Sequence, residues 1–174
     1  MKVLEAALAE ARAAITPEAV AALAGEVTAA RRCFLYGVGR NGLMLQAFAM
    51  RLHHLGLEAP FVGQLATPPI GPGDVLVLAA ALGSLPSADA MAAAAARAGA
   101  RVAVITARPE KVPLAHLRIN LPARTMDDAG TGALPLGSGF ELALHLLCEV
   151  VVVHILEQRR LTDADLAARH ANLL

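Results

Sequence analysis

The chain has no tryptophan, and only 3% of its 174 residues are aromatic. Its 15 lysines and arginines balance its 15 aspartates and glutamates, so the formal net charge is zero. Nucleic-acid-binding proteins usually offer a basic stripe to the phosphates and aromatic rings to the bases. Since the sequence has little of either feature, we expect no nucleic-acid partner.

Cysteine is also scarce. The two thiols, Cys33 and Cys148, each lie inside an apolar segment. This usage indicates buried thiols in a reducing compartment rather than a disulfide framework or a metal site. The sequence therefore predicts a cytoplasmic protein without a bound metal.

Long hydrophobic runs are missing as well, although 56% of the residues are hydrophobic. A membrane-spanning helix needs about 18–20 consecutive apolar residues. The longest candidate, residues 140–156, is interrupted by two glutamates and two histidines: Glu141, His145, Glu149 and His154. Acidic residues interrupt the first ten positions too, so we expect neither a secretory signal nor a membrane role. Some apolar surface is instead expected to be covered by partner subunits.

Short apolar runs alternate with helical patterns along the chain. Five runs predict strands, at residues 33–36, 59–62, 75–80, 101–106 and 117–121. Helical patterns lie at 3–14, 17–29, 43–55, 87–98, 109–115, 138–160 and after Thr162. This alternation predicts an α/β protein with a five-stranded parallel sheet in an αβα sandwich. The helices at both termini flank one domain, residues 1–174.

The first predicted strand runs into a turn with three glycines. Gly37, Gly39 and Gly42 enclose Arg40 and Asn41, and a helical pattern follows. A strand, a glycine-rich turn and a helix together present backbone N–H groups and a positive helix end to an anion. The guanidinium adds a forked cation that suits phosphate or carboxylate. Glycines that serve only the packing of the turn are the alternative.

The same turn fits the spacing G-x-G-x-x-G of dinucleotide-binding proteins, which alone is a weak signal. That fingerprint also needs an acidic residue at the end of the next strand, about 20 residues further on. Glu58 lies near this distance, but it precedes the apolar run 59–62 rather than ending it. We therefore do not expect a nucleotide.

Ligands of parallel sheets bind beyond the carboxyl ends of the strands. This rule brings three turns around one crevice, at residues 37–41, 80–87 and 106–109. Glu141 begins the long helical pattern that follows, where backbone N–H groups would favour its ionised form and make it a base. An ordinary carboxylate in the first turn of a helix is the alternative.

Two histidine patterns have structural alternatives. Glu141, His145 and Glu149 share one helix face and could hold a metal. Because the helix is otherwise apolar, a hydrogen-bonded polar line at an interface is favoured over a metal site. His53 and His54 lie late in a helix, where the helix dipole alone favours histidine.

Four stretches resemble the sugar isomerase (SIS) domain family, and within it the 6-phospho-3-hexuloisomerases. They are G-V-G-R-N-G at 37–42 with A-F-A-M-R-L-H-H-L-G at 47–56, V-G-Q-L-A-T-P-P-I-G-P-G-D at 62–74, P-L-G-S-G-F-E-L at 135–142 and A-R-H-A-N-L at 168–173. The resemblance implies a flavodoxin-like sandwich that assembles as a homotetramer. It also implies the isomerisation of D-arabino-3-hexulose 6-phosphate to fructose 6-phosphate, without a metal or an organic cofactor.

The resemblance implies a role for particular residues. Glu141 would be the carboxylate that moves a proton between adjacent carbons, and His170 would assist ring opening or proton transfer at the carbonyl. A solvated histidine near the chain end is the alternative for His170. Arg40 would lie on the phosphate side. The other substrate-binding candidates are Gly37, Gly39, Asn41, Gln64, Gly83, Ser84 and Ser87.

The turn after the third predicted strand departs from the family pattern, which reads close to S-G-S-G-E-T and cradles the phosphate with hydroxyls. Residues 80–85 read A-A-L-G-S-L here. Ser84, Ser87 and the N–H groups of the next helix could partly substitute, although Pro86 has no N–H. Three functions therefore stay open: a hexulose-phosphate isomerase, an isomerase of another and even unphosphorylated sugar, or a non-catalytic sugar-phosphate-binding protein.

Overall fold

The computed structural model describes residues 1–128 and 132–172, so Leu173, the end of the fourth motif, lies outside the described residues. The strands are β1 (Cys33–Gly37), β2 (Val75–Ala79), β3 (Arg101–Thr106) and β4 (Leu117–Asn120). The helices are α1 (Lys2–Ala14), α2 (Pro17–Ala29), α3 (Arg40–His54), α4 (Pro86–Arg97), the 3₁₀ turn η1 (Pro109–Lys111), α5 (Ser138–Arg159) and α6 (Asp163–Ala167).

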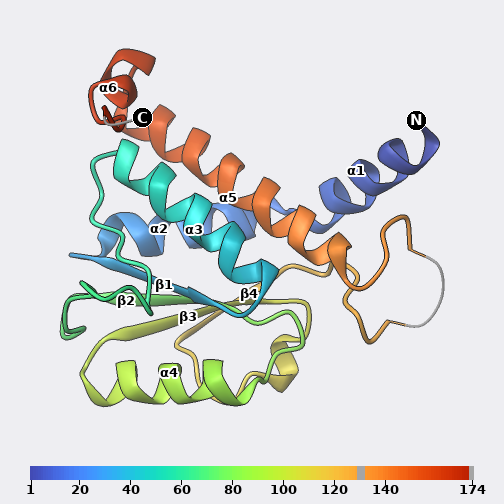
Figure 1. Ribbon diagram of the computed structural model, residues 1–174, viewed down its shortest axis with the longest axis horizontal. Coiled ribbons are helices and arrows are strands. Elements are labelled where there is room, and N and C mark those ends of the chain that lie inside the picture. The colour runs from blue at the N-terminus through green and yellow to red at the C-terminus, as the bar shows by residue number, and fades with distance from the viewer. Residues whose placement is uncertain (129–131, 173–174) are drawn as a thin grey trace.

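All strand pairs are parallel, and the order across the sheet is β1-β2-β3-β4. Helices α2, α3 and α5 cover one face and α4 covers the other (Figure 1). Successive strand residues point to opposite faces. In β2, for example, Val75 and Val77 join the core under α5, whereas Leu76 and Leu78 join the core over α4. The α/β class and the sandwich are confirmed.

The prediction of a fifth strand at 59–62 was wrong. This segment joins β1 through a single bridge between Leu35 and Phe61. The Leu35 N–H donates to the Pro60 carbonyl at 3.0 Å, and the Val62 N–H donates to Leu35 at 2.9 Å. Proline has no N–H to return to the ladder, so the pairing cannot extend into a strand. The segment nevertheless covers the free edge of β1.

The predicted starts of two terminal helices are confirmed. The Thr16 side chain accepts a hydrogen bond from the Ala19 N–H at the start of α2, with Pro17 at the first helical position. Thr162 and Asp165 form a reciprocal capping box at the start of α6. Each pairing satisfies backbone N–H groups that the first helical turn leaves without a partner.

The helix predicted at 87–98 begins one residue earlier, at Pro86, and no serine caps it. Its N-cap is Leu85, which makes no side-chain capping bond, and Pro86 takes the first helical position. Proline's fixed φ angle suits that position, so the helix starts there without a hydroxyl cap. The helix predicted at 109–115 was also too long, since only the three residues of η1 are helical.

Helix α5 lies at the centre of the helical layer, where it packs against α1, α2 and α3. Among the described residues it is the one helix long and apolar enough to cross a membrane. Half of that apolar stretch is buried inside the protein, which is the pattern of a core helix.

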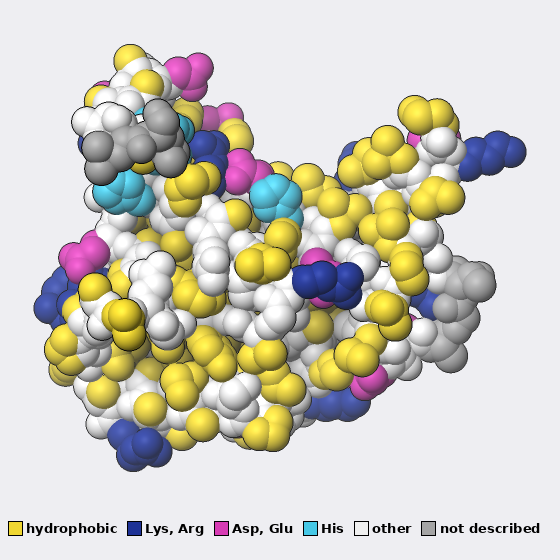
Figure 2. Space-filling model, viewed as in Figure 1, with side chains coloured by type: hydrophobic (Ala, Val, Ile, Leu, Met, Phe, Trp, Pro, Cys, Tyr) yellow, Lys and Arg dark blue, Asp and Glu magenta, His cyan; other side chains and the backbone are white. Residues whose placement is uncertain are grey.

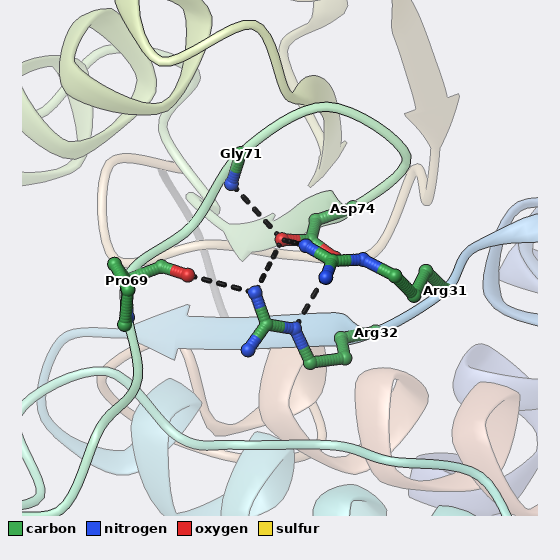
Figure 3. A network of polar contacts seen from close by, with 5 residues as sticks. All are labelled: Arg31, Arg32, Pro69, Gly71 and Asp74. Carbon is green, nitrogen blue, oxygen red and sulfur yellow. Dashed lines mark hydrogen bonds and ion pairs between the residues drawn. The ribbon is translucent and has the colours of Figure 1, made fainter.

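A charged cluster joins β1 and β2 at their amino ends (Figure 3). The fully buried carboxylate of Asp74 accepts two hydrogen bonds from Arg31, two from Arg32 and one from the Gly71 N–H, at 2.9–3.3 Å. Arg32 also donates to the Pro69 carbonyl at 2.7 Å. Burial alone would raise the pKa of Asp74, but the hydrogen bonds from Arg32, Gly71 and Arg31 outweigh it and hold that pKa below its ordinary value.

Candidate active site

A pocket of about 370 Å³ opens at the carboxyl ends of β1 and β2. Its walls come from the turn after β1, the turn after β2, the loop before α5 and the first turn of α5. The pocket occupies the crevice that the sheet topology predicts. One wall differs from the prediction, because residues 125–126, 136–137 and 140–141 line the pocket and the turn 106–109 does not.

The turn after β1 is tight because α3 begins directly against the strand. A Cβ atom on Gly42 would lie 2.4 Å from the Gly37 carbonyl oxygen, and one on Gly37 would lie 2.9 Å from the Gly42 nitrogen. No other residue fits such an approach. Gly39, the N-cap of α3, lines the pocket together with Arg40, whereas Gly37 serves the packing behind them.

The turn after β2 gives the pocket an apolar wall. Ala80, Ala81, Leu82 and Leu85 all line it. Gly83 lies behind them with a φ of +88°, and a Cβ atom there would lie 2.5 Å from the carbonyl oxygen of Arg108. The structure thus gives Gly83 a packing role, and the side chains that face the cavity are apolar.

The three polar side chains predicted to bind substrate from other turns do not line this pocket. Ser84, Ser87 and Gln64 are all exposed. The Ser84 hydroxyl donates to the carboxylate of Asp89 at 2.6 Å, in the first turn of α4. A carboxylate beside a helix N-terminus occupies the position that a bound anion would favour.

Arg40 and Glu141 connect the two sides of the pocket. The Nε atom of Arg40 lies 3.0 Å from Oε2 of Glu141. Its Nη1 donates to the Ser138 hydroxyl at 2.9 Å, and its Nη2 donates to the Leu136 carbonyl at 2.8 Å. The carboxylate side chain is 18% exposed and the guanidinium side chain 51%. One arginine therefore holds the start of α5 and the loop before it against the start of α3.

The expectation that backbone N–H groups at the start of α5 would favour the ionised form of Glu141 was wrong. Burial raises the pKa of Glu141 above its ordinary value, while the charge and the hydrogen bond of Arg40 act in the opposite direction. The loss of hydration in the pocket wall therefore exceeds the help that the cation gives the anion. A carboxylate whose pKa moves toward neutral is a better proton acceptor.

Asn41 brings a second polar group to the pocket. Its Oδ1 atom is buried, and no hydrogen-bond partner for it lies among the described residues. A buried acceptor without a partner costs about 1–3 kcal/mol. A hydroxyl group of a ligand that donates to this oxygen would recover that cost.

The structure does not bring His170 to Glu141 within one chain. The His170 ring stacks on the ring of His54, with centroids 5.3 Å apart, at the C-terminal end of α3. Arg40 pairs with Glu141 at the other end of that 15-residue helix. At a rise of 1.5 Å per residue, the two ends lie about 20 Å apart. In Figure 1, α6 lies beyond the C-terminal end of α5, away from the start of that helix.

Of the polar residues that share one face of α5 (Glu141, His145 and Glu149), the last contacts the neighbouring helix α3. Glu149 lies 3.2 Å from Arg51 of α3 and forms an ion pair with it. Within residues 1–128 and 132–172, no group of three or more histidine, cysteine, aspartate or glutamate side chains is placed to hold a metal ion.

Several pocket residues in the loop before α5 and in the first turn of α5 had no predicted role. Thr125, Met126, Leu136 and Phe140 line the pocket. Two signals could have found them. This loop leaves the carboxyl end of β4, where ligands of such sheets bind, and it runs into the motif at 135–142.

Comparison with solved structures identifies the class of protein. A hypothetical protein of Methanococcus jannaschii, whose structure was taken to infer a 3-hexulose-6-phosphate isomerase function, matches with a TM-score of 0.85 and 26% identity over 100% of both chains. The sugar isomerase domain of an RpiR transcription factor from Sphaerobacter thermophilus matches with a TM-score of 0.71 and 15% identity, over 97% of this chain and 91% of that one. The second likeness shows the fold alone. The fold is that of sugar isomerase domain proteins.

Curated relatives narrow the class to a family. The 3-hexulose-6-phosphate isomerase of Mycobacterium gastri is 36% identical over 171 residues, which cover 95% of this chain and 85% of the relative. That of Bacillus subtilis is 34% identical over 164 residues, which cover 91% and 89%. The chain belongs to the 3-hexulose-6-phosphate isomerase family. No protein-family model matches it.

Proposed function

We propose that the protein interconverts 3-hexulose 6-phosphate and fructose 6-phosphate. The observation that carries the proposal is the place of Glu141, on the wall of the pocket at the carboxyl edge of the sheet. Its raised pKa suits a carboxylate that accepts a proton from carbon. The pocket volume of about 370 Å³ lies within the range of small-molecule sites.

The proposed reaction moves one proton between two neighbouring carbons. The Glu141 carboxylate takes the proton from C2 of the 3-hexulose while the oxygen on C3 gains a proton, which gives the 2,3-enediol. The proton then returns to C3 and the oxygen on C2 loses its own, which gives the ketone of fructose 6-phosphate. The buried Oδ1 of Asn41 can accept a hydrogen bond from a sugar hydroxyl in either form.

The second proton-transfer group is proposed to be His170 of another copy of the chain. Within one chain the histidine lies about 20 Å from Glu141, too far for direct proton transfer. Apolar side chains on α1, α3 and α5 offer a surface for that copy (Figure 2), each 43–57% exposed: Leu4, Leu8, Leu43, Met50, Val150 and Val153. A homotetramer is the proposed assembly. Light scattering that finds a stable monomer at micromolar concentration would contradict it.

Subunit complementation tests this arrangement. Glu141→Gln and His170→Ala should each be inactive alone. Co-expressed in one oligomer, they should recover up to about a quarter of wild-type turnover, because a mixed pair contains one site with both native groups. If the two residues acted within one chain, every mixed site would lack one of them and turnover would stay at the level of the single variants.

The turn after β2 favours a second candidate function, the isomerisation of an unphosphorylated sugar. Leu82 and Leu85 line the cavity, and Asp89 carries negative charge in the first turn of α4. A bound phosphate would have to rely on the backbone N–H groups that follow Pro86, because Ser84 and Ser87 do not line the pocket. Isomerisation assays with phosphorylated and free ketohexoses in parallel decide between the two functions. Binding of fructose 6-phosphate without any turnover would instead support a non-catalytic protein.

A triple substitution sharpens that decision. Ala80→Ser, Leu82→Ser and Leu85→Thr together restore hydroxyls to the cavity wall. If phosphate binds there, fructose 6-phosphate should bind more tightly by up to about 3 kcal/mol in calorimetric titration. If the substrate carries no phosphate, the same change should weaken its binding, because an apolar wall is lost. Unchanged affinity for every sugar would mean that this turn does not contact the ligand.

A further inference from the structure

Arg40 makes a fork-shaped contact with one segment of the chain. Its Nε, Nη1 and Nη2 atoms each contact a group within residues 136–141, at 2.8–3.0 Å. The contacted groups are a carboxylate, a hydroxyl and a backbone carbonyl. All three accept hydrogen bonds, and together they match the donor directions of a planar guanidinium.

We propose that Arg40 is a positioning residue, which holds the Glu141 carboxylate and the loop before α5 in place, and not the ligand of a substrate phosphate. The inference rests on the function proposed above, since it deepens the account of the same pocket. A phosphate bound to this guanidinium would have to compete with Glu141 for one cation. It would also have to replace the contacts that hold the loop against α3.

The contact with the loop restrains an unusual backbone. The carbonyl of Leu136 accepts a hydrogen bond from Arg40. Leu136 has a φ of +52°, a backbone conformation that residues other than glycine rarely adopt. The next residue, Gly137, also has a positive φ, of +76°. Such conformations persist where surrounding contacts hold them. Arg40 supplies one of these contacts from a different element of the fold.

The contact with Glu141 also affects its proton affinity. Arg40 opposes the rise in the pKa of Glu141 that burial causes. Without the cation, a larger share of Glu141 would carry a proton at a given pH and could not act as a base. An arginine that only bound phosphate would change substrate affinity and leave the proton affinity of the carboxylate as it was.

The experiment compares Arg40→Gln, Arg40→Lys and the matched control Arg51→Gln. Arg51 also joins α3 to a glutamate of α5, at 3.2 Å from Glu149, but does not line the pocket. The first readout is a carbon-13 NMR titration of the Glu141 carboxyl in the free protein, assigned with Glu141→Gln. It needs no activity. The second readout is the pH profile of kcat/KM, with kcat and KM determined separately.

We expect Arg40→Gln to raise the pKa of Glu141 and to move the acidic limb of kcat/KM to higher pH. At a fixed pH on that limb, turnover should fall about tenfold while KM changes little. Arg40→Lys keeps the positive charge, so the pKa of Glu141 should stay close to its wild-type value. It should not restore kcat, because a single ammonium cannot make the forked contact. Arg51→Gln should leave the Glu141 titration unchanged.

The opposite result is equally clear. If Arg40→Gln raises KM for fructose 6-phosphate tenfold or more, with kcat and the Glu141 titration unchanged, Arg40 is a phosphate ligand and the inference is overturned. A wild-type protein without turnover on any sugar would overturn the proposed function alone. In that case a shifted Glu141 titration in Arg40→Gln still supports the positioning role, and an unshifted one overturns it.

Discussion

A carboxylate that pairs with arginine lies at each end of the parallel strands, and the pKa values of the two carboxylates are shifted in opposite directions. At the amino edge, two arginines and a backbone N–H surround Asp74, whose carboxylate is fully buried and whose pKa is lowered. At the carboxyl edge, one arginine contacts Glu141, whose side chain is 18% exposed and whose pKa is raised. Figure 3 shows how closely the first carboxylate is enclosed.

The difference shows what separates a structural carboxylate from a reactive one. Both oxygens of Asp74 are occupied by donors, so its charge is stabilised and no oxygen is left to accept a proton. Of the two Glu141 oxygens, Oε2 lies against Arg40, and the side chain borders a cavity. The number of donors around a carboxylate thus matters more than its charge partner. Substitutions at the two edges should therefore affect different properties.

The largest expected effect is on folding, at the amino edge. Asp74→Ala removes the buried carboxylate that connects the starts of β1 and β2, and Arg31 and Arg32 both lose their ion pair with it. We expect a loss of about 3–5 kcal/mol in the free energy of unfolding, measured by urea titration at pH 7. Glu141→Gln is the control and should unfold at nearly the wild-type urea concentration. A loss under 1 kcal/mol for Asp74→Ala would mean that the cluster is solvated and contributes little.

The next effect is on turnover, at the carboxyl edge. Glu141→Gln keeps the size of the side chain and its place in the first turn of α5, but it cannot accept the proton. If the proposed function holds, kcat should fall at least about 100-fold, the scale of general-base catalysis. Circular dichroism should show an unchanged fold. Turnover near that of the wild type would remove Glu141 from the mechanism.

A smaller effect should follow from pH alone. The pKa of Asp74 is lower in the folded protein than in the unfolded chain, so its contribution is fully present above the unfolded-state pKa of about 3.9. Stability should then be lost as the pH falls through the folded-state value, because the unfolded chain takes up the proton first. Urea titrations between pH 6 and 3 should show a shallower decline in Asp74→Asn than in the wild type. Parallel declines in the two proteins would assign the acid sensitivity to other carboxylates.

The sequence predicted most of the fold because burial and backbone chemistry act locally. The apolar run at 75–80 became β2, buried along its whole length. The segment at 59–62 was wrongly predicted as a strand because it is apolar, yet Pro60 prevents a continuous ladder. Whether an apolar run forms a strand depends on its backbone N–H donors as well as on its hydropathy. The cluster around Asp74 was not predicted, since it depends on two distant segments, residues 31–32 and 69–74, that meet only in the fold.

The candidate site was predicted in part. Gly39, Arg40, Asn41 and Glu141 do line one pocket, because the carboxyl ends of parallel strands meet at one edge. The predicted pairing with His170 is absent within the chain. A sequence motif names a residue type but cannot say which copy of the chain supplies it. Side-chain orientation was equally out of reach for the polar residues that prove exposed: Gln64, Ser84 and Ser87.

The smallest expected effect separates the two arginines around Asp74. Arg32 is 13% exposed, donates to Pro69 as well as to Asp74, and lies over the Phe34 ring at 5.2 Å. Arg31 makes a similar pair of hydrogen bonds but is 59% exposed. We expect Arg32→Ala to cost about 2 kcal/mol in urea unfolding, since buried hydrogen bonds to a charged group are lost. Arg31→Ala should cost under about 1 kcal/mol, as exposed ion pairs do. Equal losses would show that Asp74 needs both donors alike, and that the enclosure of Arg32 adds nothing to the cluster.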